Sequence, residues 1–419
     1  MQQPISIPIR NQTQGTPRAI IEHVLSQTAS PPVRSLYIHV PFCFHKCHYC
    51  DFYSIVDPRD RQEPFTDRLI RELEALAPLT RSSPLHTIFI GGGTPTLLRP
   101  ELWLRLLTTL NSHFDLTDIR AGRGEFTVEC NPETATPELF DILRAGGVDR
   151  LSLGAQSFNP IHLKTLERWH DPANVARAIT LAKAAGIARQ SIDLIFAIPG
   201  QTLDDWKSDL HAALALGVDH LSCYSLTYEP NTAMTARLKR GEFAPADEDL
   251  EVEMHHETLR TLRAAGLDRY EVSNYARSGE ESRHNLAYWR QHQWLAAGPS
   301  ASAHVAGHRW KNSPRLDDYL AIDDAGCTNI QDLETPDPRR ALAETIMTGL
   351  RLREGLDRNI ILANAERVTP TSSKRLDRVI SRLTHQGWLQ PDEGRLALTD
   401  EGFLFADSAA ADLMRCLKP

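Results

Sequence analysis

Three cysteines, Cys43, Cys47 and Cys50, stand close together in the run Phe-Cys-Phe-His-Lys-Cys-His-Tyr-Cys. Iron–sulfur cubanes are normally held by four thiolates, so three clustered cysteines with no fourth at hand leave one iron with an open coordination position. An open position on a metal is where a substrate or cofactor binds, as it is in catalytic zinc sites. The spacing therefore predicts a [4Fe–4S] cluster with one reactive corner.

A zinc site is the alternative interpretation of the same cysteines. Structural zinc needs a closed set of four ligands, and no second pair of cysteines or histidines follows at the usual spacing. However, His39, His45 and His48 are close enough in the sequence to complete such a set. The cysteines alone therefore leave zinc open.

An apolar run farther along the chain ends in three glycines, Gly91, Gly92 and Gly93, followed by Thr94. Only glycine lets the backbone at the end of a strand approach a ligand this closely. The cysteine spacing, with Tyr49 just before the last cysteine, resembles the radical S-adenosylmethionine (SAM) superfamily, in which SAM chelates the open iron. The resemblance implies that the glycine loop faces the amino group of SAM.

The composition is that of a globular protein of more than one domain. The chain has 419 residues, 41% of them hydrophobic and 24% charged, with a net charge of −8. Its apolar stretches are too short and too often interrupted by charge to span a bilayer, and residues 1–33 lack the order of a secretory signal. These features predict a cytoplasmic protein, in which the seven cysteines stay reduced as a cluster requires. The four cysteines outside the triad have no spacing pattern and are interpreted as structural or neutral.

A strand-then-helix alternation follows a polar segment, residues 1–33, which is expected to be a flexible tail. The expected strands are Leu36–Val40, Thr87–Ile90, Phe126–Val128, Arg150–Leu153, Ser191–Ile195 and His220–Tyr224. The expected helices after them are Phe65–Ala77, Glu101–Leu110, Glu138–Ala145, Ala173–Ala185, Leu203–Leu216 and Leu250–Ala265. Strands that alternate with helices predict a parallel sheet with right-handed crossovers.

Six such units predict an α/β fold, an open (βα)6 partial TIM barrel over residues 34–265, which is also the fold known for radical SAM cores. Function collects at the carboxyl ends of the strands in barrels of this type. Glu129, Gln156 and Asp193 stand at or near the ends of three expected strands, and an acidic residue within an apolar strand is costly unless it is paired or used. Structural pairing explains any one of them, but the three together favour a site.

Four further runs carry a narrower resemblance: Gly-Ala-Gln-Ser-Phe at 154–158, Leu-Glu-Arg-Trp-His-Asp at 166–171, Asp-Leu-Ile-Phe-Ala-Ile-Pro-Gly at 193–200 and Ser-Cys-Tyr-Ser-Leu-Thr-Tyr-Glu-Pro at 222–230. They are similar to the family that contains oxygen-independent coproporphyrinogen III oxidase and the HemW-type haem chaperones. The resemblance implies a SAM pocket formed by Tyr37, Gly92, Gly93, Thr94, Glu129, Gln156, Arg168 and Asp193. In that pocket the glycine backbone and Glu129 would bind the ammonium of SAM, and Arg168 would bind its carboxylate. Asp193 or Gln156 would accept hydrogen bonds from its ribose hydroxyls.

Two features separate the oxidase from the chaperone within that family. The oxidase has an additional cysteine two residues after the triad, whereas this chain has Phe52. In addition, the His-Asn-x-x-Tyr-Trp motif that chaperones associate with haem binding is present as His284, Asn285, Tyr288 and Trp289. Histidine is a common axial ligand of haem iron, and aromatic rings pack against a porphyrin face. A core histidine is the alternative, and whether His284 ligates the iron is open.

The remainder of the chain is divided into a connecting segment, residues 266–337, and a C-terminal domain, residues 338–419. Expected helices Arg339–Leu350 and Lys374–Gln386, a hairpin around Asp392–Gly394 and a helix capped by Thr399 predict a helical, winged-helix-like domain. Residues 335–419 hold 13 Lys and Arg against 12 Asp and Glu, without the basic stripe that DNA affinity needs. We therefore expect no nucleic-acid partner.

Three functional hypotheses follow. The favoured one is a haem chaperone that carries haem as cargo to an apo-haemoprotein client, on a core with a [4Fe–4S] cluster and SAM. The second is oxidative decarboxylation of coproporphyrinogen III through a 5′-deoxyadenosyl radical. The third is a radical SAM enzyme with another substrate. An electron-donor protein is a possible partner in each case.

Overall fold

The computed structural model describes residues 32–80, 83–321, 326–392 and 394–418. Six strands lie side by side in the order of the chain, and all pair in parallel. They are β1 (Ser35–Val40), β2 (Thr87–Gly92), β3 (Glu125–Cys130), β4 (Arg150–Gln156), β5 (Arg189–Phe196) and β6 (His220–Ser225). The six strands expected from the sequence are confirmed.

The sheet does not close into a full barrel. At the β6 end it continues into the antiparallel strands β8 (Asn274–Ala276) and β7 (Asp268–Arg269), and at the other end β9 (Leu295–Ala297) pairs in parallel with β1. In the resulting nine-stranded order, β7 and β9 stand at the two edges. This is the open partial barrel that the sequence predicts.

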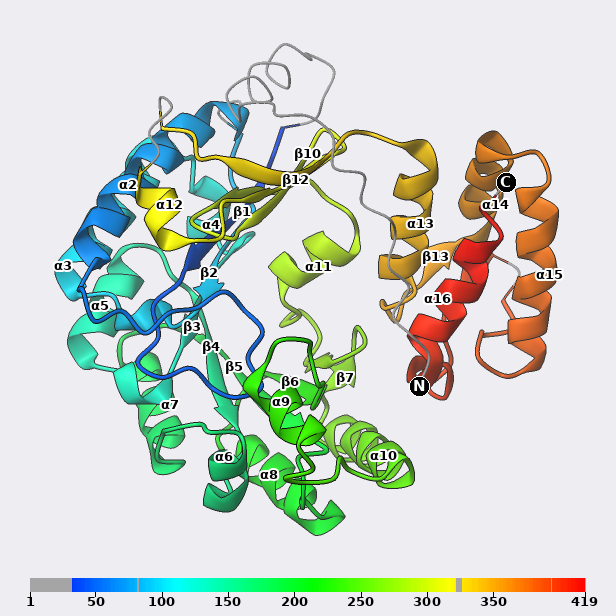
Figure 1. The fold of residues 1–419 in the computed structure, drawn as a ribbon, viewed down its shortest axis with the longest axis horizontal. Coiled ribbons are helices and arrows are strands. Elements are labelled where there is room, and N and C mark those ends of the chain that lie inside the picture. The colour runs from blue at the N-terminus through cyan, green and yellow to red at the C-terminus, as the bar shows by residue number, and fades with distance from the viewer. Residues whose placement is uncertain (1–31, 81–82, 322–325, 393, 419) are drawn as a thin grey trace.

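Helices cover the outer face of the sheet (Figure 1). The six expected helices are confirmed as α2 (Gln62–Leu76), α3 (Pro100–His113), α5 (Pro137–Ala145), α7 (Ala173–Ala184), α8 (Leu203–Ala215) and α10 (Glu248–Ala264), joined by the shorter α4 (Thr117–Arg120), α6 (Pro160–Thr165) and α9 (Ala233–Lys239). Trp103 of α3 and Trp206 of α8 are fully buried in the core. The apolar stripe of each helix packs there because only that stripe can leave water without a polar cost.

The period-two alternation of the strands makes the inside of the barrel polar. In β1, Leu36 and Ile38 are fully buried in the core, whereas the intervening Tyr37 lines a cavity within the barrel. The same alternation sends Glu129 of β3 and Asp193 of β5 into that interior. The barrel therefore encloses a polar lumen, which can receive a polar ligand.

The segment between the barrel and the C-terminal domain, residues 266–337, packs on the same core. It includes β7, β8 and β9, the helix α11 (Arg283–Trp289), and an antiparallel three-stranded sheet of β10 (Ser302–Val305), β11 (His308–Asn312) and β12 (Ile330–Glu334) with α12 (Leu316–Ala321) inserted. Leu295 and Tyr319 are fully buried in that core. Figure 1 shows α11 between the barrel and α13.

The C-terminal part has a hydrophobic core of its own, with Ile346, Leu376 and Leu413 at its centre. Its elements are α13 (Pro338–Gly349), α14 (Arg358–Val368), α15 (Ser372–His385), α16 (Ala406–Arg415) and the paired strands β13 (Leu356–Asp357) and β14 (Arg395–Leu396). The two expected helices are present as α13 and α15. The hydroxyl of Thr399 accepts a hydrogen bond from the Gly402 N–H at 2.8 Å, at the start of the short turn that leads into α16.

The flexible tail expected for residues 1–33 lies outside the described residues except for its last two positions. None of the described helices is long and apolar enough to cross a membrane.

Candidate functional site

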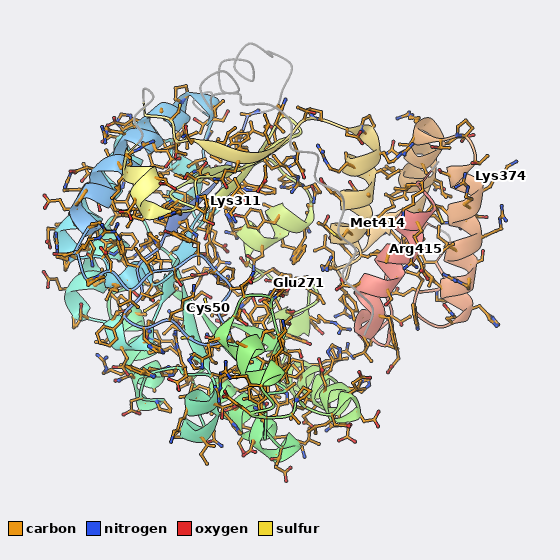
Figure 2. The ribbon with its side chains drawn as sticks, in the orientation of Figure 1. Cys50, Glu271, Lys311, Lys374, Met414 and Arg415 are labelled. Atoms are coloured by element: carbon orange, nitrogen blue, oxygen red, sulfur yellow. The ribbon has the colours of Figure 1, made fainter. Side chains whose placement is uncertain are left out.

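The loop after β1 carries the three cysteines over the carboxyl ends of the strands. Its backbone is held from both sides: Thr94 N–H donates to the Phe42 carbonyl at 2.7 Å, and Cys43 N–H donates to the Ile55 carbonyl at 2.9 Å. Cys43, Cys47 and Cys50 all line one cavity of about 440 Å³ (Cys50 is labelled in Figure 2). The sequence-predicted ligand set therefore converges on a single space.

Burial favours the protonated form of thiols in this cavity. Burial raises the pKa of Cys43, and it raises the pKa of Cys50 to about 11. Thr94 and Arg168 oppose this effect on the pKa of Cys43; the Thr94 hydroxyl lies 3.6 Å from Cys43 Sγ, and the Arg168 guanidinium contacts the neighbouring Cys47 Sγ at 3.8 Å. A metal centre that binds here must displace the thiol protons, and the nearby guanidinium then offsets the negative charge.

Three thiolates from one loop suit a cubane, which spreads its ligands over several iron atoms and keeps one iron open to a further ligand. Of the histidines that could complete a zinc site, His45 also lines this cavity, whereas His39 lines the barrel interior.

The three glycines after β2 leave no room for side chains. A Cβ on Gly91 would lie 2.7 Å from the Glu129 carboxyl carbon, and one on Gly93 would lie 2.7 Å from the Phe42 carbonyl oxygen. Gly92 has a positive φ of 112°, and its N–H donates to Glu129 Oε2 at 3.0 Å. Glycine is therefore required here both by backbone conformation and by the approach of the cysteine loop.

Two acidic side chains share the cavity beside the glycine loop. Burial and the neighbouring Asp193 raise the pKa of Glu129 to about 7. Burial likewise raises the pKa of Asp193, whose carboxylate accepts a hydrogen bond from the Ser152 hydroxyl at 3.1 Å. Two neighbouring buried carboxyls of raised pKa carry no cationic partner between them among the described residues, so a cationic, hydroxyl-bearing ligand would stabilise their charged forms.

Arg168 supplies the complementary positive charge in the same cavity. Its Nη2 donates to the Gly154 carbonyl at 2.8 Å, while its buried Nε has no hydrogen-bond partner among the described residues. An orphaned guanidinium N–H next to two acidic groups suits a ligand that carries both an ammonium and a carboxylate, as SAM does. Gln156 and Thr94 line the same cavity, so the residues present fit SAM beside a cluster.

A second cavity of about 540 Å³ continues from the first into the barrel lumen, with Glu129 and Asp193 on the wall between them. Tyr37 lines this lumen rather than the cysteine cavity, and its hydroxyl lies 3.0 Å from His39 Nδ1. The lumen also holds residues that sequence reasoning missed: Arg150, Ser222, Tyr224 and Lys311. The alternation of inward and outward side chains along β4 and β6 could have identified Arg150, Ser222 and Tyr224. No local sequence pattern marks Lys311 in β11 as a lumen residue.

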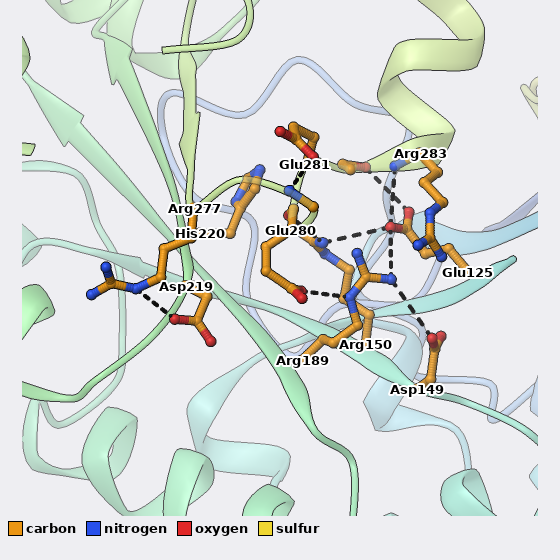
Figure 3. A network of polar contacts seen from close by, with 12 residues as sticks. Glu125, Asp149, Arg150, Arg189, Asp219, His220, Arg277, Glu280, Glu281 and Arg283 are labelled. Atoms are coloured by element: carbon orange, nitrogen blue, oxygen red, sulfur yellow. Dashed lines mark hydrogen bonds and ion pairs between the residues drawn. The ribbon is translucent and has the colours of Figure 1, made fainter. Parts of the chain in front are cut away.

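A buried ionic network closes the floor of the lumen (Figure 3). The fully buried Glu125 carboxylate lies 3.5 Å from Arg150 Nη1 and 3.4 Å from Arg189 Nη1. It also accepts the backbone N–H groups of Arg283 at 3.1 Å and His284 at 3.3 Å. The network therefore ties β3, β4 and β5 to the first turn of α11.

The residues of the His-Asn-x-x-Tyr-Trp motif form α11, but they do not face one common space. Asn285 and Tyr288 line the lumen. His284 is fully buried, with Nδ1 2.9 Å from the Thr87 hydroxyl and its ring packed against Tyr288, and burial lowers its pKa to about 4. Trp289 lies under Arg351 of the C-terminal domain, 5.7 Å from the guanidinium. The structure therefore brings the predicted cluster residues together with the predicted SAM residues other than Tyr37, which lines the adjoining lumen, and it separates the predicted haem residues.

Comparisons with known proteins agree with this geometry. The radical SAM superfamily profile matches residues 37–213, and that of the HemN C-terminal domain matches residues 337–405. The heme chaperone HemW of Mycobacterium tuberculosis is 37% identical over 90% of this chain and 94% of its own length, and that of Escherichia coli is 32% identical over 90% and 97%. The solved structure of the coproporphyrinogen III oxidase HemN from Escherichia coli superposes with a TM-score of 0.81 at 22% identity, covering 94% of this chain and 93% of the oxidase, which shows a common fold. With relatives this similar along nearly their whole length, the chain belongs to the family of the heme chaperone HemW, within the radical SAM superfamily.

Proposed function

We propose that this protein is a haem chaperone, which binds haem as cargo and delivers it to an apo-haemoprotein in the cytoplasm. The observation that carries the proposal is the similarity to HemW chaperones over 90% of the chain. The oxidase structure shares the fold, but at 22% identity it does not extend its activity to this chain.

We further propose that Cys43, Cys47 and Cys50 hold a [4Fe–4S] cluster and that the cavity beside them binds SAM. In this superfamily a bound cluster supplies one-electron reduction of SAM. Glu129 and the Gly92 backbone would receive the ammonium of SAM, and Arg168 would receive its carboxylate. Asp193, oriented by Ser152, would accept a ribose hydroxyl.

Phe52 separates this proposal from the oxidase alternative. Its ring stands where the oxidase pattern has a further cysteine, and it is 62% exposed at the junction of the cysteine cavity and the lumen. An exposed aromatic ring cannot ligate iron or transfer a proton, so it removes whatever that cysteine does in the oxidase. Apolar surface at the mouth of a polar cavity is instead typical of a docking position.

An anaerobic assay with coproporphyrinogen III tests the proposal. The reconstituted protein, with SAM and a chemical reductant, is expected to give no protoporphyrinogen while retaining haem on gel filtration. Protoporphyrinogen formation at many turnovers per chain would make the protein an oxidase. Absence of both haem retention and decarboxylation would leave a radical SAM enzyme with another substrate, and the proposal would be wrong.

A further inference from the structure

The lumen of the barrel has one aromatic wall. Tyr37 of β1, Phe89 of β2, Tyr288 of α11 and Trp294, just before β9, all line it. The ring centroids of Tyr37 and Phe89 lie 6.2 Å apart, and those of Tyr288 and Trp294 lie 4.5 Å apart. A row of rings along one side of a cavity offers a broad apolar surface to a flat, conjugated ligand.

His284 packs between the two pairs of rings. Its ring centroid lies 5.3 Å from that of Phe89 and 4.6 Å from that of Tyr288, and its Nδ1 lies 2.9 Å from the Thr87 hydroxyl. The side chain is fully buried, and its Nε2 has no hydrogen-bond partner among the described residues. The motif histidine therefore supports the aromatic wall as a positioning residue, whereas Tyr288 presents its ring to the lumen.

Two basic side chains line the lumen, and only one of them is bound to a carboxylate. Nη1 of the buried Arg150 donates to the Glu280 carbonyl at 3.0 Å and lies 3.5 Å from the Glu125 carboxylate, which offsets its charge. Lys311 of β11 (labelled in Figure 2) is half-buried, and among the described residues no carboxylate forms an ion pair with it. The ammonium of Lys311 is therefore available to an anionic ligand.

The acidic groups of the lumen all stand where it meets the cysteine cavity. Each of its three carboxyls, Asp51, Glu129 and Asp193, lines both spaces, so the ammonium of bound SAM would offset their charge. The lining that belongs to the lumen alone holds the aromatic wall, hydroxyl groups and the two cations, and no carboxyl among the described residues. This part of the barrel therefore suits a flat, conjugated ligand that carries negative charge.

On the basis of the proposed function, we infer that the haem cargo lies in the lumen against this aromatic wall, with a propionate on Lys311. Haem is a flat conjugated ring with two carboxylates, and an ammonium–carboxylate contact fixes one edge of that ring. The lumen measures about 540 Å³, within the range of about 300–1,000 Å³ that is typical of pockets for organic ligands. Lys311 is then the residue that distinguishes a carboxylated porphyrin from an uncharged one.

The lumen recognises the porphyrin rather than its iron. His39 and His220 both line it, but each already engages both ring nitrogens in hydrogen bonds. Their partners are the Tyr37 hydroxyl and the Tyr53 carbonyl for His39, and the Ser191 and Tyr270 hydroxyls for His220. Binding is therefore expected to depend on the face of the ring and on the propionate.

Parallel titrations of the full-length, cluster-loaded protein with haemin and with haemin dimethyl ester, whose propionates are blocked, test this site. The parent is expected to bind haemin about tenfold more tightly than the ester, because the ester cannot form the charge-assisted contact with Lys311. Lys311→Gln is expected to bind haemin about tenfold more weakly than the parent and the ester equally well, so that the preference disappears. Lys311→Arg retains the charge and should retain the preference.

Two further variants complete the comparison. Tyr288→Leu shortens the aromatic wall and is expected to weaken the binding of haemin and of the ester severalfold and by the same factor. Lys374→Gln changes an exposed lysine on α15, outside the lumen, and should bind both ligands as the parent does. Iron content and circular dichroism of each variant distinguish a lost contact from misfolding.

The outcomes separate the site from the function. A parent that binds neither ligand overturns the chaperone proposal itself. A parent that binds haemin, with a Lys311→Gln variant that still prefers free propionates or loses both ligands equally, overturns the role of Lys311 alone. Unchanged affinity of Tyr288→Leu for both ligands would place haem outside the lumen.

Discussion

At the scale of single residues, three thiols decide whether this chain holds a cluster. Each of Cys43→Ala, Cys47→Ala and Cys50→Ala is expected to abolish the iron–sulfur absorbance after anaerobic reconstitution, because a cubane that already lacks a fourth cysteine does not survive on two. Iron and sulfide analysis of each variant measures this.

Cys130 is the sharpest control for that experiment, because it lines the same cavity. Its thiol donates to the Asn131 carbonyl at 3.4 Å, and burial raises its pKa to about 12. Cys130→Ala is therefore expected to keep the full iron content. Loss of iron in this variant would identify a fourth protein ligand, and the open coordination position would not exist.

Glu129 is expected to make SAM binding depend on pH. Its pKa near 7 means that the carboxyl is protonated below that pH and cannot pair with an ammonium, so SAM affinity should rise as pH increases through about 7. Glu129→Gln keeps the shape, removes the charge, and should weaken SAM binding about tenfold (~1.4 kcal/mol) at about pH 8 with little dependence on pH. Calorimetric titration of cluster-loaded parent and variant provides the comparison. A Gln variant as tight as the parent at high pH would show that Glu129 does not receive the ammonium.

At the scale of elements, the buried network around Glu125 couples three strands to α11. Glu125→Gln removes the shared charge but leaves Arg150 and Arg189 buried, so we expect a loss of about 3–5 kcal/mol in the free energy of unfolding. Asp219→Asn removes the exposed pair with Arg277 at 2.9 Å and should cost less than about 1 kcal/mol. Urea unfolding of both variants tests the contrast. Equal losses would mean that the network does not hold the floor of the lumen.

The six strand–helix units could be predicted from the sequence because each carries a local signal, a short stretch with apolar residues followed by a helical period. β9 is three residues long and pairs with β1 only because the chain returns to the far edge of the sheet, so no local pattern marks it. The sequence does not predict the three-stranded sheet of β10, β11 and β12 for a related reason. Its middle strand, β11, mixes Trp310 with His308, Arg309 and Lys311, so it has no clear apolar alternation, and the three strands form only through pairing with one another.

The residues of the site likewise divide into those that the sequence predicts and those that it does not. Cys43, Cys47 and Cys50 were predictable because one loop carries all three, and Glu129 because it stands at the end of β3. Asp193 was expected at a strand end as well, but it lies within β5 and reaches the cavity because the strand alternation turns its side chain inward. The sequence did not indicate that a side chain on Gly93 would collide with the Phe42 carbonyl. Glycine is therefore needed at this position for the packing of the cysteine loop, and not only for the approach of a ligand. Nor did it indicate that His284 turns toward Thr87, because the orientation of a helix residue depends on which neighbours the helix packs against.

At the scale of the whole molecule, the junction of the barrel with the C-terminal domain contains a buried acid. Glu271 (Figure 2) is fully buried beside the backbone bridge to Leu352, one carboxyl oxygen has no partner among the described residues, and burial raises its pKa to about 7. For a carboxyl whose pKa is higher in the folded than in the unfolded protein, the charged form is disfavoured in the folded state. Its protonated form adds stability to the folded protein when the pH is below the unfolded-state pKa of about 4.5, and this contribution is lost as the pH rises through about 7. Stability should therefore fall over that window by at most about 3 kcal/mol.

Glu271→Gln is expected to flatten this dependence and to make the protein more stable than the parent at about pH 8. Thermal unfolding between about pH 5 and pH 8 measures the effect. Glu281→Gln, on a nearby turn, makes the same change of charge outside the junction and should retain the slope of the parent. An unchanged slope in Glu271→Gln would show that the acid does not titrate in this window.

Whether this chain carries haem can be measured by a stoichiometric haem titration of the cluster-loaded, full-length protein. A haem chaperone is expected to give a saturable Soret change with an end-point at one haem per chain, typical of a ligand with a defined site. A change that grows with added haem without saturating, as haem in buffer does, would show that the chain has no haem site.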